Sequence, residues 1–77
     1  MQLIYLSPQY QVVEYSGVNG FELIDRSRSC STYLQGTLAD TFRQTLTHII
    51  AGGGEQDLVD EFLGGYHELM RQPAVYH

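Results

Sequence analysis

Histidines and carboxylates are the side chains of this sequence that bear most directly on metal binding. The histidines are His48, His67 and His77, and no two stand four residues apart, the spacing that puts paired zinc ligands on one helical face. Asp60 precedes His67 by about two helical turns and can share its face. One imidazole and one carboxylate are an incomplete ligand set. We therefore expect no metal or other cofactor, and keep a metal-ion or small-molecule binding protein as the alternative function.

Covalent catalysis would need a nucleophile beside a histidine base. Residues 27–31 supply three serines and Cys30, and His48 or His67 could act as the base. The sequence lacks the Gly-x-Ser-x-Gly turn that marks a hydrolase nucleophile. Residues of these types occur in any chain of this composition, so we expect a protein that is not an enzyme.

The charge balance disfavours a surface for nucleic acid or anionic lipid. The formal net charge is −5, and four arginines with no lysine face nine acidic residues. Nucleic-acid binding usually needs a basic face that neutralises phosphates, and anionic membranes repel an acidic protein. Arg26 and Arg28 are a small local exception, which keeps a nucleic-acid accessory factor as the third interpretation.

No segment predicts a membrane span or a secretion signal. The apolar runs are far shorter than the roughly 18 residues that a span needs, and Met1–Tyr5 lacks the basic region and cleavage site of a signal peptide. The single cysteine, Cys30, cannot form an internal disulfide and is typical of a reduced cytosolic thiol. We expect one cytoplasmic domain over residues 1–77.

The first half of the chain predicts β-strands. Four segments rich in β-forming residues are separated by turn signals: Gln2–Leu6, Tyr10–Tyr15, Phe21–Asp25 and Cys30–Gln35. Pro8 interrupts the first pair, and Asn19-Gly20 is a strong hairpin signal. Since consecutive strands usually pair, we expect an antiparallel meander.

The second half predicts two helices. Apolar residues recur at helical spacing in both: Leu38, Phe42, Leu46, Ile49 and Ile50, then Leu58, Val59, Phe62, Leu63, Tyr66, Leu69 and Met70. The first helix should begin at Thr37, with its hydroxyl capping the Asp40 amide, and end at Gly52–Gly54. The second should cover Glu55–Met70, with Gly64–Gly65 inside it at about 1 kcal/mol each relative to alanine.

Together these elements predict an α+β fold: a four-stranded antiparallel meander sheet followed by two C-terminal helices packed on one face (ββββαα). Leu3 and Tyr5 should point to one face of the sheet, and Ile4 and Leu6 to the other. Val12-Val13 also divides between the faces. Two helices can cover only one face, so we expect the remaining apolar surface to meet a second copy of the chain, which would offset the small core.

Tyrosines on the strands are the expected interface residues, because tyrosine is enriched in protein interfaces. They are Tyr5, Tyr10, Tyr15 and Tyr33. The alternative is that they cap strand edges with their hydroxyls in water. The sequence thus indicates a non-enzymatic protein-interaction module, homodimeric through its sheet, which acts through its sheet or its second helix on a further protein of unknown identity.

Three parts of the sequence carry a resemblance. They are Met1-Gln2-x-Ile4-Tyr5-x-Ser7 with Tyr10-x-Val12-Val13-Glu14, then Gly20-Phe21-Glu22-x-Ile24-Asp25, then Val59-Asp60-Glu61-Phe62-Leu63-Gly64 with Leu69-Met70-x-Gln72-Pro73-x-Val75-x-His77. They are similar to strings in a family of short, uncharacterised, mainly betaproteobacterial proteins catalogued as a domain of unknown function. The resemblance runs nearly end to end, with a shorter loop after the second strand. It implies a bacterial cytoplasmic protein and no activity. It also indicates that the C-terminal tail, Ala74–His77, docks on the domain.

Overall fold

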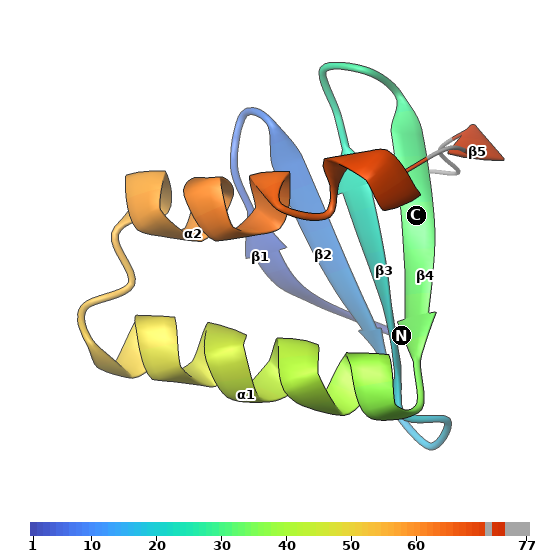
Figure 1. Ribbon diagram of the computed structural model, residues 1–77, viewed down its shortest axis with the longest axis horizontal. Coiled ribbons are helices and arrows are strands. Elements are labelled where there is room, and N and C mark those ends of the chain that lie inside the picture. The colour runs from blue at the N-terminus through green and yellow to red at the C-terminus, as the bar shows by residue number, and fades with distance from the viewer. Residues whose placement is uncertain (71, 74–77) are drawn as a thin grey trace.

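The computed structural model describes residues 1–70, 72 and 73. A meander of four strands comes first: β1 (Gln2–Leu6), β2 (Tyr10–Tyr15), β3 (Gly20–Asp25) and β4 (Cys30–Gln35). Two helices follow, α1 (Thr37–Ala51) and α2 (Gln56–Gly64), and then a short 3₁₀ helix, η1 (His67–Leu69), and a two-residue strand, β5 (Gln72–Pro73). The α+β fold expected from the sequence is confirmed (Figure 1).

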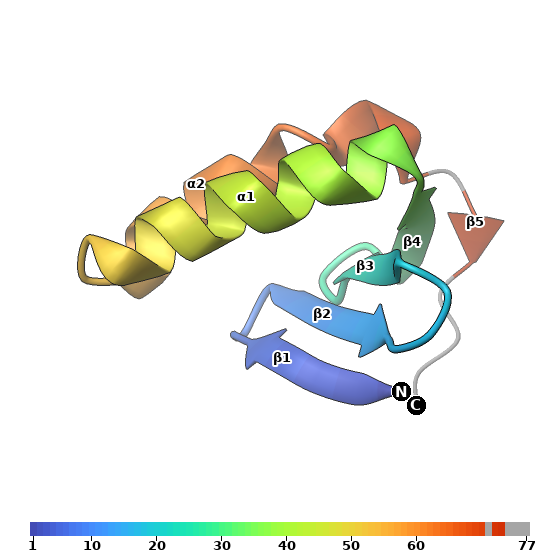
Figure 2. The same ribbon diagram turned by 90° about the horizontal axis from the view of Figure 1, so that it is seen from below.

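The strands form one sheet in the order β1-β2-β3-β4-β5, and every neighbouring pair is antiparallel. Both helices lie on the same face of this sheet (Figure 2). The turn between β2 and β3 has Gly17 at a φ of 88° and Asn19 at 47°, whereas Gly20 of the predicted Asn19-Gly20 signal is already the first residue of β3. We call the face opposite the helices the bare face.

The start of α1 differs from the expectation. Gly36, at a φ of 64°, is the N-cap, and no side chain caps the helix. The predicted Thr37 cap is wrong because Thr37 is already the first helical residue, and the Asp40 amide donates to the Gly36 carbonyl at 3.0 Å. Glycine reaches this left-handed backbone without the steric cost that a Cβ brings. The predicted end of α1 at Gly52 is confirmed.

The end of α2 also differs. The helix stops at Gly64 instead of continuing to Met70, because two consecutive glycines are poor helix formers. Gly65 and Tyr66 donate to carbonyls three residues back, those of Phe62 and Leu63, at 3.1 and 3.0 Å. The chain then makes a separate turn at η1. The apolar residues that were predicted to form one stripe on a long helix are therefore divided between α2 and the segment that contains η1.

β5 is the one strand of the described chain that the sequence did not predict. Its two residues pair with β4, with Gln72 opposite Ser31 and Pro73 opposite Cys30. A strand of two residues is too short to show alternation in the sequence. Pro73 was interpreted only as the residue that ends the second helix. The docked tail expected over Ala74–His77 lies outside the described residues.

The core fills the space between the sheet and the helices. Most apolar side chains of β2, β3 and β4 that face the helices are buried, and so are several inward residues of α1 and α2; the buried set includes Val12, Phe21, Leu23, Leu34, Phe42, Leu46, Val59 and Leu63. Phe42 lies at the centre of an aromatic cluster: its ring centroid is 5.0 Å from Phe21, 5.5 Å from Phe62 and 5.5 Å from Tyr66. Much of the buried apolar volume therefore depends on this one side chain.

A β-bulge interrupts the pairing of β1 with β2. Leu3 is opposite Val13 and Tyr5 is opposite Val12, so Ile4 is the extra residue. Ile4 and Tyr5 both pack against the core, whereas Leu3 and Leu6 point to the bare face. The predicted alternation through β1 is therefore wrong, because a bulge resets it.

Candidate functional site

The bare face is apolar at its middle and at its β1 border, and only the border is exposed. Val13 and Ile24, in the middle, are 2% and 0% exposed. Leu3 and Leu6, on β1, are 50% and 53% exposed. The strands are thus apolar on both faces, as the sequence indicated. The apolar surface left open to another molecule lies along β1.

The structure divides the four expected interface tyrosines between the two faces. Tyr5 and Tyr10 face the helices, and Tyr10 is only 5% exposed in the core. Tyr15 and Tyr33 lie on the bare face, with their ring centroids 5.8 Å apart. The set is therefore not one continuous surface, and only Tyr33, 44% exposed, offers a largely open ring.

Tyr5 connects β1 to α2. Its hydroxyl donates to the Asp60 carboxylate at 2.8 Å, and the Ser7 hydroxyl donates to the same carboxylate at 3.0 Å. Ser7 Oγ in turn accepts from the Tyr10 amide at 3.0 Å. Because one carboxylate on α2 accepts from the end of β1 and from the turn that follows it, this network fixes the position of β1 against the helix layer.

Tyr15 and Tyr33 pack around Gly20 on the bare face. The Tyr15 hydroxyl donates to Glu22 at 2.8 Å. A Cβ on Gly20 would overlap the Tyr33 phenol, so in this conformation the ring lies directly over the β3 backbone at glycine. These contacts order the two rings within the chain itself.

Two tyrosines make the stability of the fold depend on alkaline pH. Burial, together with hydrogen bonds to Asp60 and Glu22 respectively, raises the pKa of Tyr5 and of Tyr15 from 10.0 to about 12. Since the unfolded chain loses these protons first, the stabilisation is complete below pH 10 and is lost as the pH rises to about 12. Urea denaturation at a series of pH values should show the decline. The double variant Tyr5→Phe/Tyr15→Phe should show a shallower one, and an unchanged slope would contradict this assignment.

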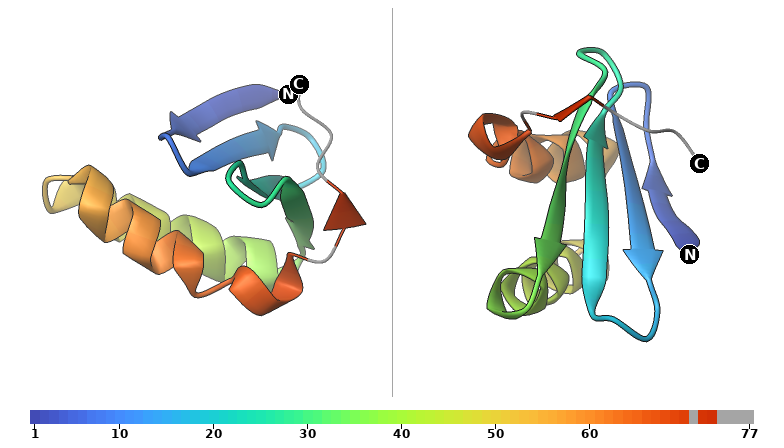
Figure 3. Two further views of the ribbon diagram at one scale, coloured as in Figure 1. Left: turned by 90° about the horizontal axis from the view of Figure 1, so that it is seen from above. Right: turned by 90° about the vertical axis from the view of Figure 1, so that its right-hand side faces the viewer.

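The outer edge of β1 is open. β1 ends the sheet, and within the described part of the chain only β2 pairs with it (Figure 3). Its residues, Gln2–Leu6, include no charge and no proline, two of the features that protect an edge from pairing, although the bulge at Ile4 is another such feature. We call this strand side, with the exposed Leu3 and Leu6, the β1 edge. Edges of this type pair with another strand through their free amide and carbonyl groups.

The pair suggested by the sequence as a metal or ligand site, Asp60 and His67, is engaged elsewhere. Asp60 accepts from Tyr5 and Ser7, and the His67 Nδ1 atom lies 2.6 Å from the Arg28 guanidinium. Over residues 1–70, 72 and 73, no three histidine, cysteine or acidic side chains are grouped as metal ligands. His48 lies apart from both, on α1.

The arginine pair that suggested a nucleic-acid role is also occupied. Arg26 donates to the Ser7 carbonyl at 2.7 Å, and Arg28 contacts His67 and lies 3.7 Å from the Asp25 carboxylate. Both arginines therefore hold the turn between β3 and β4 in place.

Among residues 1–70, 72 and 73, neither the length nor the apolar character of any helix suffices for a membrane span.

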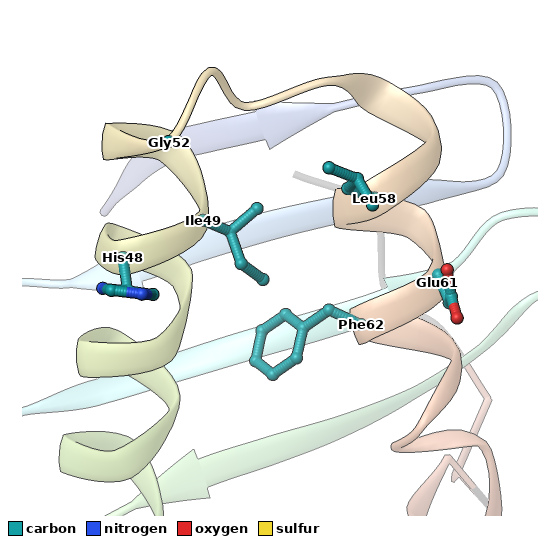
Figure 4. Close-up of a pocket in the computed structure, with 6 residues that line it drawn as sticks. All are labelled: His48, Ile49, Gly52, Leu58, Glu61 and Phe62. Carbon is teal, nitrogen blue, oxygen red and sulfur yellow. The ribbon is translucent and has the colours of Figure 1, made fainter.

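A second open surface lies between the two helices. Ile49 of α1 and Phe62 of α2 reach into the space between them from opposite sides, with Leu58 beside them (Figure 4). With His48, Gly52 and Glu61 these residues line a groove of about 570 Å³, which we call the α1–α2 groove. The sequence placed Ile49, Leu58 and Phe62 in core stripes. The signal available was that α2 carries neighbouring Leu58 and Val59, and one helix face cannot bury both fully.

Comparisons with known proteins give a family and one close relative. The whole chain, residues 1–77, matches the family described as "Protein of unknown function (DUF3567)". It is also similar to a Burkholderia thailandensis protein, BTH_I0359. The two sequences are 38% identical over an alignment 85 residues long, which covers all of both chains. No solved structure matches it.

Proposed function

Because the chain belongs to the DUF3567 family, whose description gives no function, we propose a role from its open surfaces: a non-enzymatic protein-interaction module that forms a homodimer by pairing the β1 edges of two copies. The observation that carries the proposal is an uncharged terminal strand with two half-exposed leucines, whose outer side pairs with no other strand among residues 1–70, 72 and 73. A homodimer of this kind is isologous, so each copy contributes the same strand.

The bulge selects the register of this pairing. In an antiparallel pair, residues directly opposite each other share a face of the sheet. One arrangement matches bare face with bare face and core face with core face. It places Leu3 opposite Leu6 of the second copy, and Ile4 opposite Tyr5 of that copy. The two-fold axis then passes between Ile4 and Tyr5 and stands perpendicular to the sheet. The two five-stranded sheets become continuous, and both helix layers lie on the same side.

Dimerisation in this register removes apolar surface from water at two places. Leu3 and Leu6, half-exposed in one copy, pack beside their counterparts on the bare face, and Met1, 67% exposed, is two residues before Leu3 in the chain. A strand of five residues gives a small interface compared with the roughly 800 Å² per partner of a stable one. We therefore expect a dimer that dissociates on dilution.

The chemistry of the polar side chains supports a role other than catalysis. The carboxylates and cations that a reaction could use hold elements together instead: Asp60 joins β1 to α2, and Arg43 of α1 pairs with Glu14 of β2 at 2.8 Å. The Arg43 guanidinium also lies 4.7 Å from the Phe21 ring centroid. Each of these groups has a bonding partner within the fold.

Light scattering coupled to size-exclusion chromatography tests the homodimer. At high micromolar concentration we expect a mass twice the 8.7 kDa of one chain, and at low micromolar concentration a shift towards 8.7 kDa. A mass of one chain across the whole range would refute self-association.

Small-molecule binding is the alternative that a specific observation favours. The α1–α2 groove, at about 570 Å³, is within the size range of ligand pockets and has an apolar lining. A thermal-shift screen against metal ions and metabolites separates this alternative from a protein-only role. A shift that the variant Leu58→Gln abolishes would favour the ligand.

A further inference from the structure

The α1–α2 groove is distinct from the β1 edge and stays open in the proposed dimer, because it lies in the helix layer (Figure 4). Its floor is formed by Ile49 and Phe62, which are half-buried and pack on the core. Leu58 stands at its side and is 51% exposed. An apolar floor between two helices is a surface on which a third helix can pack, with its side chains in the groove between the first two.

The rim of the groove is acidic. Glu61 lines it, and Glu55 and Asp57 are exposed at the N-terminal end of α2. Asp60, the remaining acid of α2, is turned towards Tyr5, so it belongs to the inner side. α2 itself, Gln56–Gly64, contains no basic residue. The α1 side contributes His48.

The charge of the rim identifies the class of occupant. A second copy of this chain is a poor one, since it carries a net charge of −5 and no lysine. The three arginines in the described residues, Arg26, Arg28 and Arg43, are also bonded within their own fold. A segment with an apolar stripe flanked by lysine or arginine complements both the floor and the rim.

We propose that the α1–α2 groove binds a basic amphipathic helix of a partner protein. Leucine-type side chains at positions i, i+3 or i+4 and i+7 of that helix fill the space between Ile49, Leu58 and Phe62. Its lysine or arginine side chains lie against Glu61 and the exposed acids at the start of α2. The edge-paired dimer then presents two such grooves on one side of its sheet.

A peptide pair of opposite charge tests this proposal. Two synthetic helical peptides share one leucine stripe, and their remaining positions are lysine in one and glutamate in the other. Titrated into the ¹⁵N-labelled full chain, the leucine–lysine peptide should shift the amide resonances of α2 and of the C-terminal half of α1. The leucine–glutamate peptide should leave them unchanged. Shifts confined to another surface, or equal binding of both peptides, would overturn the proposal.

Two variants separate groove binding from general attraction between a basic peptide and an acidic protein. Leu58→Gln should weaken binding of the leucine–lysine peptide about tenfold, the loss typical of a central contact, and Glu61→Lys should weaken it by repelling the lysines of the peptide. The matched control Leu38→Gln changes a leucine of α1 that is 44% exposed and does not line the groove, so it should bind as the native chain does. If Leu58→Gln binds with native affinity, the groove is not the site. Repeating the titration with an edge variant that cannot dimerise separates failure here from failure of the dimer.

Discussion

Replacing both Leu3 and Leu6 with lysine is expected to convert the proposed homodimer into a monomer at every concentration up to high micromolar. In the proposed register the two leucines face their counterparts across the β1 edge, so the double variant brings four ammonium groups into one short strand pair. Like charges directly opposite each other destabilise strand pairing, and inserted lysine is a common natural protection of exposed edges. Apolar burial by four half-exposed leucines is lost at the same time.

Light scattering on this variant should give one chain mass, 8.7 kDa. Circular dichroism should be native, because exposed positions usually change stability by no more than about 0.5 kcal/mol. The matched control is Leu38→Lys on α1, a leucine of similar exposure, 44%, away from the sheet, and it should remain dimeric. A Leu3→Lys/Leu6→Lys variant that stays dimeric would place the interface elsewhere.

Replacing Phe42 with alanine is expected to cost about 3–5 kcal/mol in the free energy of unfolding, the usual range for a buried phenylalanine. Phe42 is 0% exposed and its ring contacts three other aromatic rings, on β3, on α2 and in the turn after it. A domain of 77 residues is stabilised by only about 5 kcal/mol or slightly more. The variant should therefore keep at most about 2 kcal/mol of its stability and unfold at a much lower urea concentration than the native chain.

Urea denaturation followed by circular dichroism measures this loss. Leu38→Ala is the control, since Leu38 lies on the same helix, is 44% exposed and is absent from the buried cluster. Leu38→Ala should lower the free energy of unfolding by much less than Phe42→Ala does. If Phe42→Ala unfolds at nearly the native urea concentration, the aromatic cluster does not carry the core.

The sheet and α1 could be predicted from local patterns. β1 to β4 are short, bounded by turn residues such as Pro8 and Asn19, and joined in chain order, so both the elements and their pairing follow from neighbours in sequence. The length of α2 could not be read so directly. Apolar spacing continues through Gly64 and Gly65 to Met70, and the sequence does not say whether two glycines are tolerated inside a helix or end it.

The position of the tyrosines depended on a feature that alternation cannot reveal. Strict alternation places Tyr5 with Leu3 on one face, but the bulge at Ile4 turns Tyr5 towards Asp60 instead. Tyr10 was also assigned by residue type alone, whereas its position opposite Asp25 on β3 places it on the core face. For Leu3 and Leu6, the sequence predicted only the face of the sheet to which each side chain points. Their exposure became evident once β1 was known to be the border of the sheet.

The α1–α2 groove depends on tertiary packing for the same reason. Ile49, Leu58 and Phe62 belong to apolar stripes that are typical of a core, and apart from the adjacency of Leu58 to Val59 nothing local distinguishes them from Leu46 or Leu63, which are buried. Which stripe residues remain accessible is decided by the distance between two helices that are joined by the Gly52–Gly54 turn.

The most direct test of the central claim is an isotope-filtered NOE experiment on a mixture of equal amounts of labelled and unlabelled chain. Pairing of the β1 edges predicts cross-peaks between the Leu3 methyl groups of one copy and the Leu6 methyl groups of the other, together with contacts between Ile4 and Tyr5. Intermolecular cross-peaks that arise instead from Leu58 or Phe62, with none from β1, would contradict it.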